Sequence, residues 1–376
     1  MNSKLPHIKT NIFTKMSKLA SDYNAINLSQ GFPNFPIDDN LVDVLKEKSN
    51  KNIHQYMPMS GDPELLYKIS ALIKSTYKRT VNPETEVLIT AGATQGIFTT
   101  ILALINKNEE VIILDPSYDC YEPAVSLAGG KAKRLPLNDD FSPNWELIKK
   151  SINHSTRMLI INSPHNPSGR IWEEQDILCL EKLMMKNPNL LLLSDEVYEH
   201  ITYDKKHISI NTISSIINRS IIISSFGKTF HVTGWKVGYL VGPKTLIEEI
   251  KKVHQFNVFS VNSVAQASIN SYVDLFNFSS IKPFFKKKRD LFQNLMKKSN
   301  FKLLPCEGTY FQLVDYSNIS SLNDIKFCEK LTIDYGVAAI PISVFNESNN
   351  DNKIIRFCFA KDDETLINAT NLLCKI

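Results

Sequence analysis

Lys228 is the residue of this chain whose type and position best suit covalent chemistry. It follows the β-branched run Ile221–Ile223 within Ser-Ser-Phe-Gly-Lys-Thr, so it is expected at the buried end of a strand. Burial lowers the pKa of a lysine and leaves a neutral amine that can attack an aldehyde. A single lysine here is more often a solvated loop residue, so the interpretation depends on groups that other segments supply.

Asp195 and Tyr198 follow a very apolar run, Asn189–Ser194. An unpaired carboxylate buried there is costly, and the N–H of a protonated pyridine would satisfy it. At ~4 Å and an effective dielectric of ~20, such a pair is worth roughly 4 kcal/mol. That energy corresponds to about three pKa units in favour of a protonated ring nitrogen. Tyr198 can hydrogen-bond a hydroxyl group on the same ring.

Two segments offer groups for a phosphate. Gly92, Ala93 and Thr94 open a helix directly after a strand, and their small size exposes backbone N–H groups at the positive helix end. Turns of this kind are also rich in small residues for packing reasons alone. Ser225 and Lys236 flank Lys228, and both can reach a phosphate, although Lys236 also fits a solvated strand residue.

Two further turns offer groups for the ring itself. Tyr118 follows an apolar strand and is placed to lie flat on an aromatic ring, while a core tyrosine is an equally good interpretation. Asn166 lies between two prolines in Ser-Pro-His-Asn-Pro and can donate its amide to a phenolic oxygen. His165 is interpreted as a turn residue. Together with Lys228 and Asp195, these groups describe a site for pyridoxal 5′-phosphate.

Arg356 is the candidate for holding a substrate carboxylate. The chain has seven arginines, and this one lies in the apolar run Lys-Ile-Ile-Arg-Phe-Cys-Phe-Ala. A buried arginine normally binds a carboxylate through two hydrogen bonds. A structural ion pair would explain it too, but beside the predicted cofactor the α-carboxylate of an amino acid is favoured. The backbone of Gly31 can complete this clamp.

The elements that must position these residues alternate strands with helices. Helices are expected at about 63–79, 93–106 and 118–127. Apolar strands separated in this way indicate an α/β fold with a mostly parallel sheet covered on both faces. Seven strands are expected, at 86–90, 110–114, 131–136, 157–162, 189–194, 220–224 and 236–242.

The regular alternation of strands and helices ends at about residue 280. A long helix, a strand at 309–316, a helix at 323–335 and a strand at 353–360 predict a smaller α+β domain. The first 40 residues show little regular pattern and are expected to pack on this domain. The predicted division is therefore a large domain at 41–280, and a small domain formed by 1–40 and 281–376.

Composition excludes several classes of protein. With 376 residues, 43% hydrophobic content and a net charge of +4, the chain is an ordinary globular protein without a nucleic-acid-binding charge pattern. Its six cysteines form no C-x-x-C pair, so no metal site is predicted and the thiols are expected to be reduced. The N-terminal residues lack the continuous apolar segment of a signal peptide, so none is expected, and no apolar run approaches the ~20 residues of a membrane span. A cytoplasmic protein without a membrane partner is predicted.

The whole chain resembles the fold-type I pyridoxal-phosphate-dependent aminotransferases of class I and II. The resemblance rests on LSQGFPNFP, AGATQGIF, DPSYDCYEPA, SPHNPSG, SDEVYEH, SSFGKTFHVTGWKVGY and IRFCFAKDD. QYMPMSG and VAAIPISVF make it most similar to the kynurenine/glutamine aminotransferase subgroup, and within that to bacterial methionine aminotransferases.

This resemblance implies a homodimer with active sites shared between subunits. It implies that Lys228 forms the imine with the cofactor and moves the proton, and that Gly31, Asn166 and Arg356 bind the substrate carboxylate. Tyr56 would reach the phosphate of the neighbouring subunit. Phe13 and Phe259 would line the substrate pocket. The other phosphate and ring contacts are those already named.

The expected activity is transfer of the amino group of L-methionine, and of other neutral or aromatic amino acids, to a 2-oxo acid by a ping-pong mechanism. A kynurenine/glutamine-type aminotransferase and a cysteine-conjugate C–S β-lyase remain alternatives, because both use the same ring-binding residues. Ser260 stands where some eukaryotic kynurenine enzymes have histidine, which disfavours kynurenine. A transcription factor that senses the cofactor would need a DNA-binding domain before LSQGFPNFP, and only about 25 residues precede it.

Overall fold

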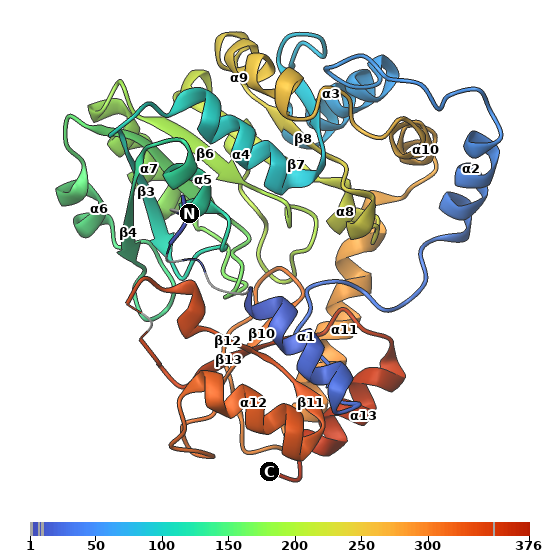
Figure 1. Ribbon diagram of the computed structural model, residues 1–376, viewed down its shortest axis with the longest axis vertical. Coiled ribbons are helices and arrows are strands. Elements are labelled where there is room, and N and C mark those ends of the chain that lie inside the picture. Colours follow the sequence, from blue (N-terminus) through green and yellow to red (C-terminus); the bar gives the residue numbers. More distant parts are fainter. Residues whose placement is uncertain (1–2, 7, 9–10, 349) are drawn as a thin grey trace.

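The computed structural model describes residues 3–6, 8, 11–348 and 350–376, and its elements gather around two sheets (Figure 1). The larger sheet has seven strands in the order β2-β8-β7-β6-β5-β3-β4. Strand β8 is antiparallel to β2 and β7, and the other pairs are parallel. The predicted seven-stranded, mostly parallel sheet is therefore confirmed. Its strands are β2 (Val87–Thr90), β3 (Glu110–Asp115), β4 (Lys131–Pro136), β5 (Thr156–Asn162), β6 (Leu191–Asp195), β7 (Ser220–Ser225) and β8 (Gly238–Val241).

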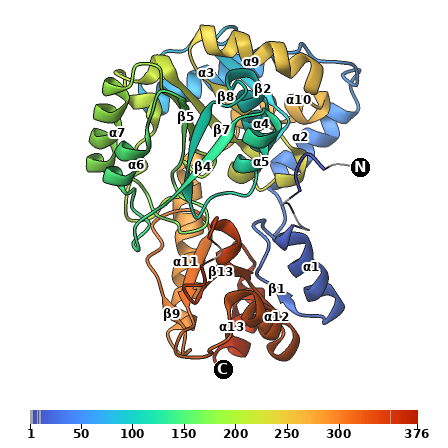
Figure 2. The same ribbon diagram turned by 60° about the vertical axis from the view of Figure 1, so that its left-hand side comes forward.

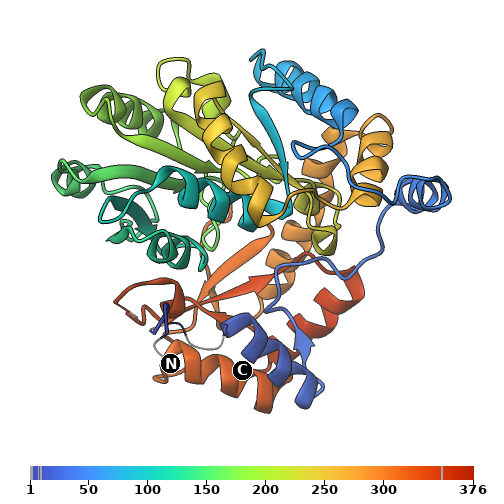
Figure 3. The ribbon, with the colours of Figure 1, turned by 45° about the horizontal axis from the view of Figure 1, so that its top comes forward.

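Helices cover both faces of this sheet because its inner strands are apolar on both sides. In β3, Val111 and Ile113 pack on one face while Ile112 and Leu114 pack on the other. The first face is covered by α4 (Gly92–Leu104), α5 (Tyr121–Leu127) and α9 (Lys244–Asn257), and α4 and α9 lie side by side (Figure 3). The opposite face is covered by α3 (Pro63–Tyr77), α6 (Trp145–Ser151), α7 (Glu174–Lys186) and α10 (Ser263–Val273), and α2 (Asp39–Ser49) packs on α10.

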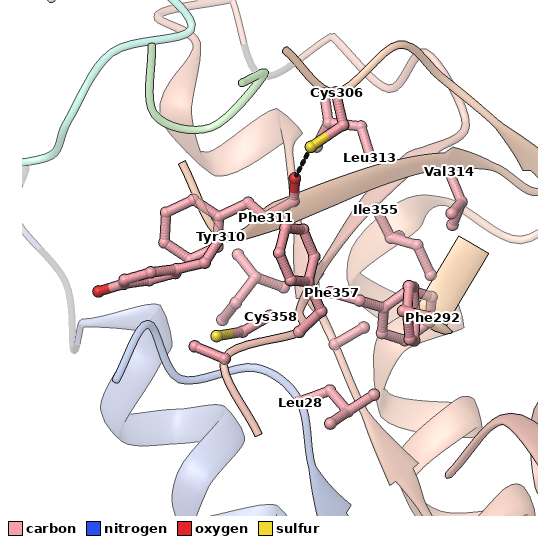
Figure 4. Close-up of a cluster of buried hydrophobic side chains, with 14 of the residues drawn as sticks. Leu28, Phe292, Cys306, Tyr310, Phe311, Leu313, Val314, Ile355, Phe357 and Cys358 are labelled. Atoms are coloured by element: carbon pink, nitrogen blue, oxygen red, sulfur yellow. Dashed lines mark hydrogen bonds between the residues drawn. The ribbon is translucent and has the colours of Figure 1, made fainter. Parts of the chain in front are cut away.

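The second sheet has four strands in the order β12-β13-β10-β9. These are β9 (Lys302–Leu303), β10 (Phe311–Asp315), β12 (Ile340–Pro341) and β13 (Ile354–Cys358). The long helix α11 (Ile281–Met296) runs down from the seven-stranded sheet to this smaller one (Figure 2). Aromatic side chains fill the core between this sheet and its helices, with Phe292, Phe311 and Phe357 packed together (Figure 4). Helices α12 (Asp324–Tyr335) and α13 (Asp363–Leu373) complete the unit.

The expectation of little regular structure in the first 40 residues was wrong. Helix α1 (Ile12–Asp22) begins there, and the side chain of Asn11 caps it by accepting from the amide of Phe13. Met16 and Ala20 are buried, and Ile12, Phe13 and Leu19 pack beside Met16, so the helix has an apolar face at helical spacing that the sequence analysis did not use. Met16 belongs to the core of the C-terminal unit, which agrees with the predicted packing. After α1, strand β1 (Ile26–Asn27) pairs with β11 (Val337–Ala338).

Two predicted boundaries also moved. Lys236 lies outside β8, in a left-handed conformation with φ of 54° that ends the turn Thr233–Trp235. Helix α5 begins at Tyr121, which leaves Tyr118 in an irregular segment after β3. The division at residues 40 and 280 stays a prediction. In the described part of the chain, no helix combines the length and apolar character that a membrane span needs.

Candidate active site

A cavity of about 240 Å³ opens at the carboxyl ends of β5, β6 and β7. In an open α/β sheet this is the edge where ligands collect. Every predicted site residue except Tyr56 and Phe259 lines it. The lining residues that the sequence predicted are Phe13, Gly31, Gly92, Ala93, Thr94, Tyr118, Asn166, Asp195, Tyr198, Ser225, Lys228, Lys236 and Arg356.

Lys228 reaches the cavity from the single-turn helix α8 (Phe226–Thr229), which follows β7 directly. Its Nζ lies 3.4 Å from the carbonyl oxygen of Gly31. The same atom lies 5.6 Å from the ring centroid of Tyr198 and 5.7 Å from that of Tyr310. Burial lowers the pKa of Lys228 to about 8, and the charge of Arg356 adds to this effect. The neutral, nucleophilic amine is therefore accessible close to neutral pH.

Asp195 ends β6 and is buried, with a hydrogen-bond donor to each carboxylate oxygen. The hydroxyl of Tyr121 donates to Oδ2 at 2.7 Å, and the amide of Val197 donates to Oδ1 at 3.3 Å. Burial raises the pKa of Asp195 to about 6, while these two hydrogen bonds lower it in part. Tyr121 was missed from the sequence, although it follows Tyr118 by three residues at the start of a helix.

Three elements converge where an anion can bind. Gly92 opens α4 with φ of 76°, and a Cβ built on it would lie 3.1 Å from Cε and 3.2 Å from Nζ of Lys236. The lysine amine therefore lies over the positive N-terminus of α4. Ser225 caps α8, its Oγ accepting from the amide of Gly227 at 3.2 Å. Thr94 Oγ1 lies 3.3 Å from the hydroxyl of Tyr118.

Arg356 enters from β13 and is 1% exposed. Its Nη1 donates to Oδ1 of Asn166 at 2.7 Å, and its Nη2 donates to the carbonyl oxygen of Ser29 at 3.3 Å. Its Nε has no hydrogen-bond partner in the part of the chain that the structure describes, and its Cζ lies 3.9 Å from the ring centroid of Phe311. Burial lowers its pKa. Among the described residues Arg356 forms no ion pair, so the structural ion pair considered as an alternative is not present.

Comparison with known proteins identifies the family of this chain. Residues 23–373 match the family "Aminotransferase class I and II". The chain belongs to the class I and II aminotransferases. It is 42% identical to methionine aminotransferase of Escherichia coli, over 99% of this chain and 97% of that protein. It is 31% identical to kynurenine–oxoglutarate transaminase 3 of Rattus norvegicus, over 96% and 87%.

Solved structures give the same result for this aminotransferase. The crystal structure of YbdL from E. coli, for which a methionine aminotransferase function was identified, matches with a TM-score of 0.97 and 41% identity. That match covers 100% of this chain and 99% of the other. N-succinyldiaminopimelate aminotransferase from Mycobacterium tuberculosis matches with a TM-score of 0.96 and 31% identity, covering 100% and 99%. Enzymes of this family depend on pyridoxal phosphate, and this is the cofactor of the aminotransferase.

The residues of the cavity fit that cofactor. A buried carboxylate, Asp195, can pair with a ring nitrogen. The amine of Lys236 and the backbone at Gly92 form a cradle for an anion. Lys228 supplies a half-buried amine between them. Tyr310, which the sequence did not reveal, stands edge-on to Tyr198 at 5.3 Å and donates from its hydroxyl to the Gly31 carbonyl at 2.7 Å.

Three other residues take different places in the aminotransferase. Tyr56 is 83% exposed and Phe259 is 48% exposed, and their rings meet at 5.2 Å outside the cavity of the same chain. His165 is buried, with its Nε2 2.9 Å from the carbonyl oxygen of Pro116 and its Nδ1 2.6 Å from Ser168 Oγ. Burial lowers the pKa of His165 to about 4. Its interpretation as a turn residue agrees with these contacts.

Proposed function

We propose that this aminotransferase moves the amino group of L-methionine, and of other neutral or aromatic amino acids, to a 2-oxo acid by ping-pong exchange. The observation that supports this substrate class is the small number of positively charged side chains in the cavity. In the described part of the chain, the cations that line the cavity are Lys228, Lys236 and Arg356. Lys228 and Lys236 serve the cofactor, so Arg356 is left for one carboxylate. A second carboxylate on the substrate would meet Phe13 and Phe311 instead.

Asp195, Asn166 and Tyr198 are the proposed ring contacts. Asp195 holds a proton on the ring nitrogen, which its buried carboxylate favours. Tyr118 covers the ring from the Thr94 side. Asn166 uses Oδ1 for Arg356 and so keeps its Nδ2 for a ring oxygen, while Tyr198 approaches the same oxygen. This assignment is supported by the cavity position of all these side chains.

The phosphate contacts proposed from this chain are Gly92, Ala93, Thr94, Ser225 and Lys236. The helix end and the amine of Lys236 balance the phosphate charge. Arg356 then fixes the α-carboxylate of the amino acid, with Gly31 beside it and Phe13 over its side chain.

Pyridoxal phosphate supplies an electron sink for breaking the bond at the substrate Cα. Lys228 does the remaining work as the general base, because its amine lies over the same cavity and has a pKa of about 8. It would take the proton from Cα of the substrate and return it to C4′, the aldehyde carbon of the cofactor. The aromatic walls from Tyr198, Tyr310 and Phe311 limit water access around this amine.

We further propose a homodimer in which each subunit completes its neighbour's site. Tyr56 and Phe259 are large, exposed and in contact with each other, as expected of an arm that reaches a partner. The test is hybrid formation. Lys228→Ala and Tyr56→Ala proteins are inactive or weak alone, and mixing them after mild denaturation restores activity if the sites are shared. Unchanged activity after mixing contradicts the arrangement.

A half-reaction tests the activity itself. The purified enzyme, loaded with pyridoxal phosphate, is mixed with methionine and no acceptor. Loss of the yellow absorbance with about one equivalent of the methionine oxo acid per subunit supports transamination. A panel of donors, including kynurenine and glutamine, ranks the substrates. Release of ammonia, a thiol and pyruvate from cysteine conjugates, without transfer from methionine, supports the β-lyase alternative.

A further inference from the structure

Three phenyl rings surround the guanidinium of Arg356. Its Cζ lies 3.9 Å from the ring centroid of Phe311, 5.3 Å from that of Phe13 and 5.8 Å from that of Phe345. Phe13 and Phe345 also meet each other at 5.9 Å with an interplanar angle of 45°. Phe345 is 2% exposed and does not line the cavity, so it lies behind the two residues that do.

The two backbone groups of Phe345 bond to different units. Its amide donates to the carbonyl oxygen of Ile342 at 3.0 Å within its own unit, while its carbonyl oxygen is held by the unit of the seven-stranded sheet. Its carbonyl oxygen accepts from Nη2 of Arg134 at 2.7 Å and from the amide of Ser117 at 3.0 Å. Arg134 lies on the edge strand β4 of the larger sheet, whereas Phe345 follows β12 of the smaller sheet. One guanidinium therefore ties a loop of the second unit to the first.

Asp115 makes this tie rigid. Its Oδ1 accepts from Nε and Nη2 of Arg134 at 2.9 and 2.8 Å, and its Oδ2 accepts from the amide of Glu347 at 2.8 Å. Nη1 of Arg134 is 2.7 Å from Glu122. We call Arg134, Asp115 and Ser117 the Arg134 clamp. It holds the segment 345–347 at two backbone groups, and Arg134 and Asp115 are largely buried.

We propose that the Arg134 clamp is a positioning device for substrate binding, acting through Phe345 on Phe13 and Arg356. The inference rests on the proposed role of Arg356 as the carboxylate ligand. Among the described residues Arg356 donates two hydrogen bonds, so the rings set the direction of its remaining N–H groups. A shift of Phe345 lets Phe13 and the guanidinium turn, and a misplaced clamp weakens binding without touching Lys228 or Asp195.

The test compares Arg134→Met and Phe345→Leu with a matched arginine variant. Arg219→Met is the control, because Arg219 also binds backbone carbonyls, those of Met184, Asn187 and Leu190, and does not line the cavity. Each enzyme is loaded with pyridoxal phosphate and assayed with the amino donor that the wild type uses best. Isothermal titration with 4-(methylsulfanyl)butanoate, which has the carboxylate but no amino group, measures binding apart from turnover.

Arg134→Met and Phe345→Leu are expected to raise KM and the Kd of the carboxylate by roughly tenfold, with kcat changed by about twofold at most. Arg134→Lys should fall between, because lysine cannot serve Asp115 and Phe345 with one planar fork. Arg219→Met should leave both constants unchanged. If Arg134→Met does not fold, Phe345→Leu decides alone.

The proposal is overturned if folded Arg134→Met and Phe345→Leu enzymes keep the wild-type KM and Kd, or if Arg219→Met raises them equally. A wild-type enzyme that transfers no amino group from any donor instead contradicts the proposed function. The two failures are therefore distinct.

Discussion

The cavity holds two buried charges of opposite sign, and it stabilises them by different means. At one end, the Asp195 carboxylate receives directed hydrogen bonds from Tyr121 and the amide of Val197. At the other end, the Arg356 guanidinium is enclosed by phenyl rings, with the Phe311 ring centroid 3.9 Å from its Cζ. Its Nε–H has no partner among the described residues. The anion is thus held by donors that tune its protonation, and the cation by faces that leave donors free for a ligand.

The largest expected effect is at the Asp195 end. Asp195→Ala removes the only carboxylate among the described residues that line the cavity. A pair of this kind is worth roughly 4 kcal/mol, or about a thousandfold in rate. Steady-state kinetics should show the loss in kcat. A loss in kcat of less than about tenfold would contradict the assigned role of Asp195, because the carboxylate would then have no role in the chemistry.

The second prediction distinguishes Asp195 from Arg356 by the pH dependence of the free energy of unfolding. In the cofactor-free protein the pKa of Asp195 is about 6 against an ordinary 3.8. The folded protein binds this proton more tightly than the unfolded chain does. The contribution to the free energy of unfolding is therefore fully present below the ordinary pKa and is lost as pH rises through about 6. That loss is at most about 3 kcal/mol.

Urea unfolding of the cofactor-free wild type and of Asp195→Asn measures this loss of unfolding free energy. The stability of Asp195→Asn relative to wild type should rise between about pH 4 and about pH 7, by up to that amount. Arg356→Met is the control, since an arginine stays charged across this range and its difference should not follow the same curve. Parallel wild-type and Asp195→Asn curves would contradict the assigned pKa shift.

The third prediction concerns the Arg356 end. Arg356→Met should lower kcat/KM for methionine by about 10- to 150-fold, because hydrogen bonds to a charged group contribute about 1.5–3 kcal/mol. Most of the effect should appear in KM, and the retention of pyridoxal phosphate after dialysis should not change. Loss of the cofactor together with the substrate affinity would place Arg356 in cofactor binding instead.

The smallest expected effect tests the role of Tyr121 as a hydrogen-bond donor to Asp195. Tyr121→Phe removes one hydrogen bond from Asp195, so the pKa of Asp195 should rise further and kcat should fall by about tenfold near neutral pH. Tyr118→Phe is the matched control, because its hydroxyl contacts Thr94 and not Asp195. Carboxyl infrared bands of the cofactor-free proteins report this pKa directly. An equal shift in both variants would count against Tyr121.

The two ends also differ in how far the sequence predicts them. Asp195 ends a strand, and Asn166 and Lys228 follow two others; these three strands are parallel neighbours in one sheet. The carboxyl ends of such strands meet at one edge, so the proximity of the three residues could be predicted. Tyr121 lies within the motif DPSYDCYEPA, three residues after Tyr118, but nothing in the motif shows that its hydroxyl faces Asp195. The surroundings of Arg356 could not be predicted in this way. Ser29 is 327 residues away in the sequence, and Phe345 reaches Arg356 because β12, which precedes Phe345, pairs with β13.

Local backbone geometry explains the remaining differences. Lys236 was assigned to a strand because its neighbours are apolar, but its left-handed conformation turns its side chain over Gly92. Helix α1 was overlooked although Ile12, Phe13, Met16, Leu19 and Ala20 recur at helical spacing. Neither error changed the predicted cavity, since the site depends on strand ends more than on these boundaries.

Borohydride reduction followed by peptide mass mapping tests the central claim most directly. The reagent fixes pyridoxal phosphate to the amine that holds it. The account predicts one pyridoxyl phosphate mass per chain, on the peptide that contains Lys228, and none on that peptide in Lys228→Ala. The label on Lys236 or on another lysine, or its absence from a protein that has been loaded with the cofactor, would contradict the account.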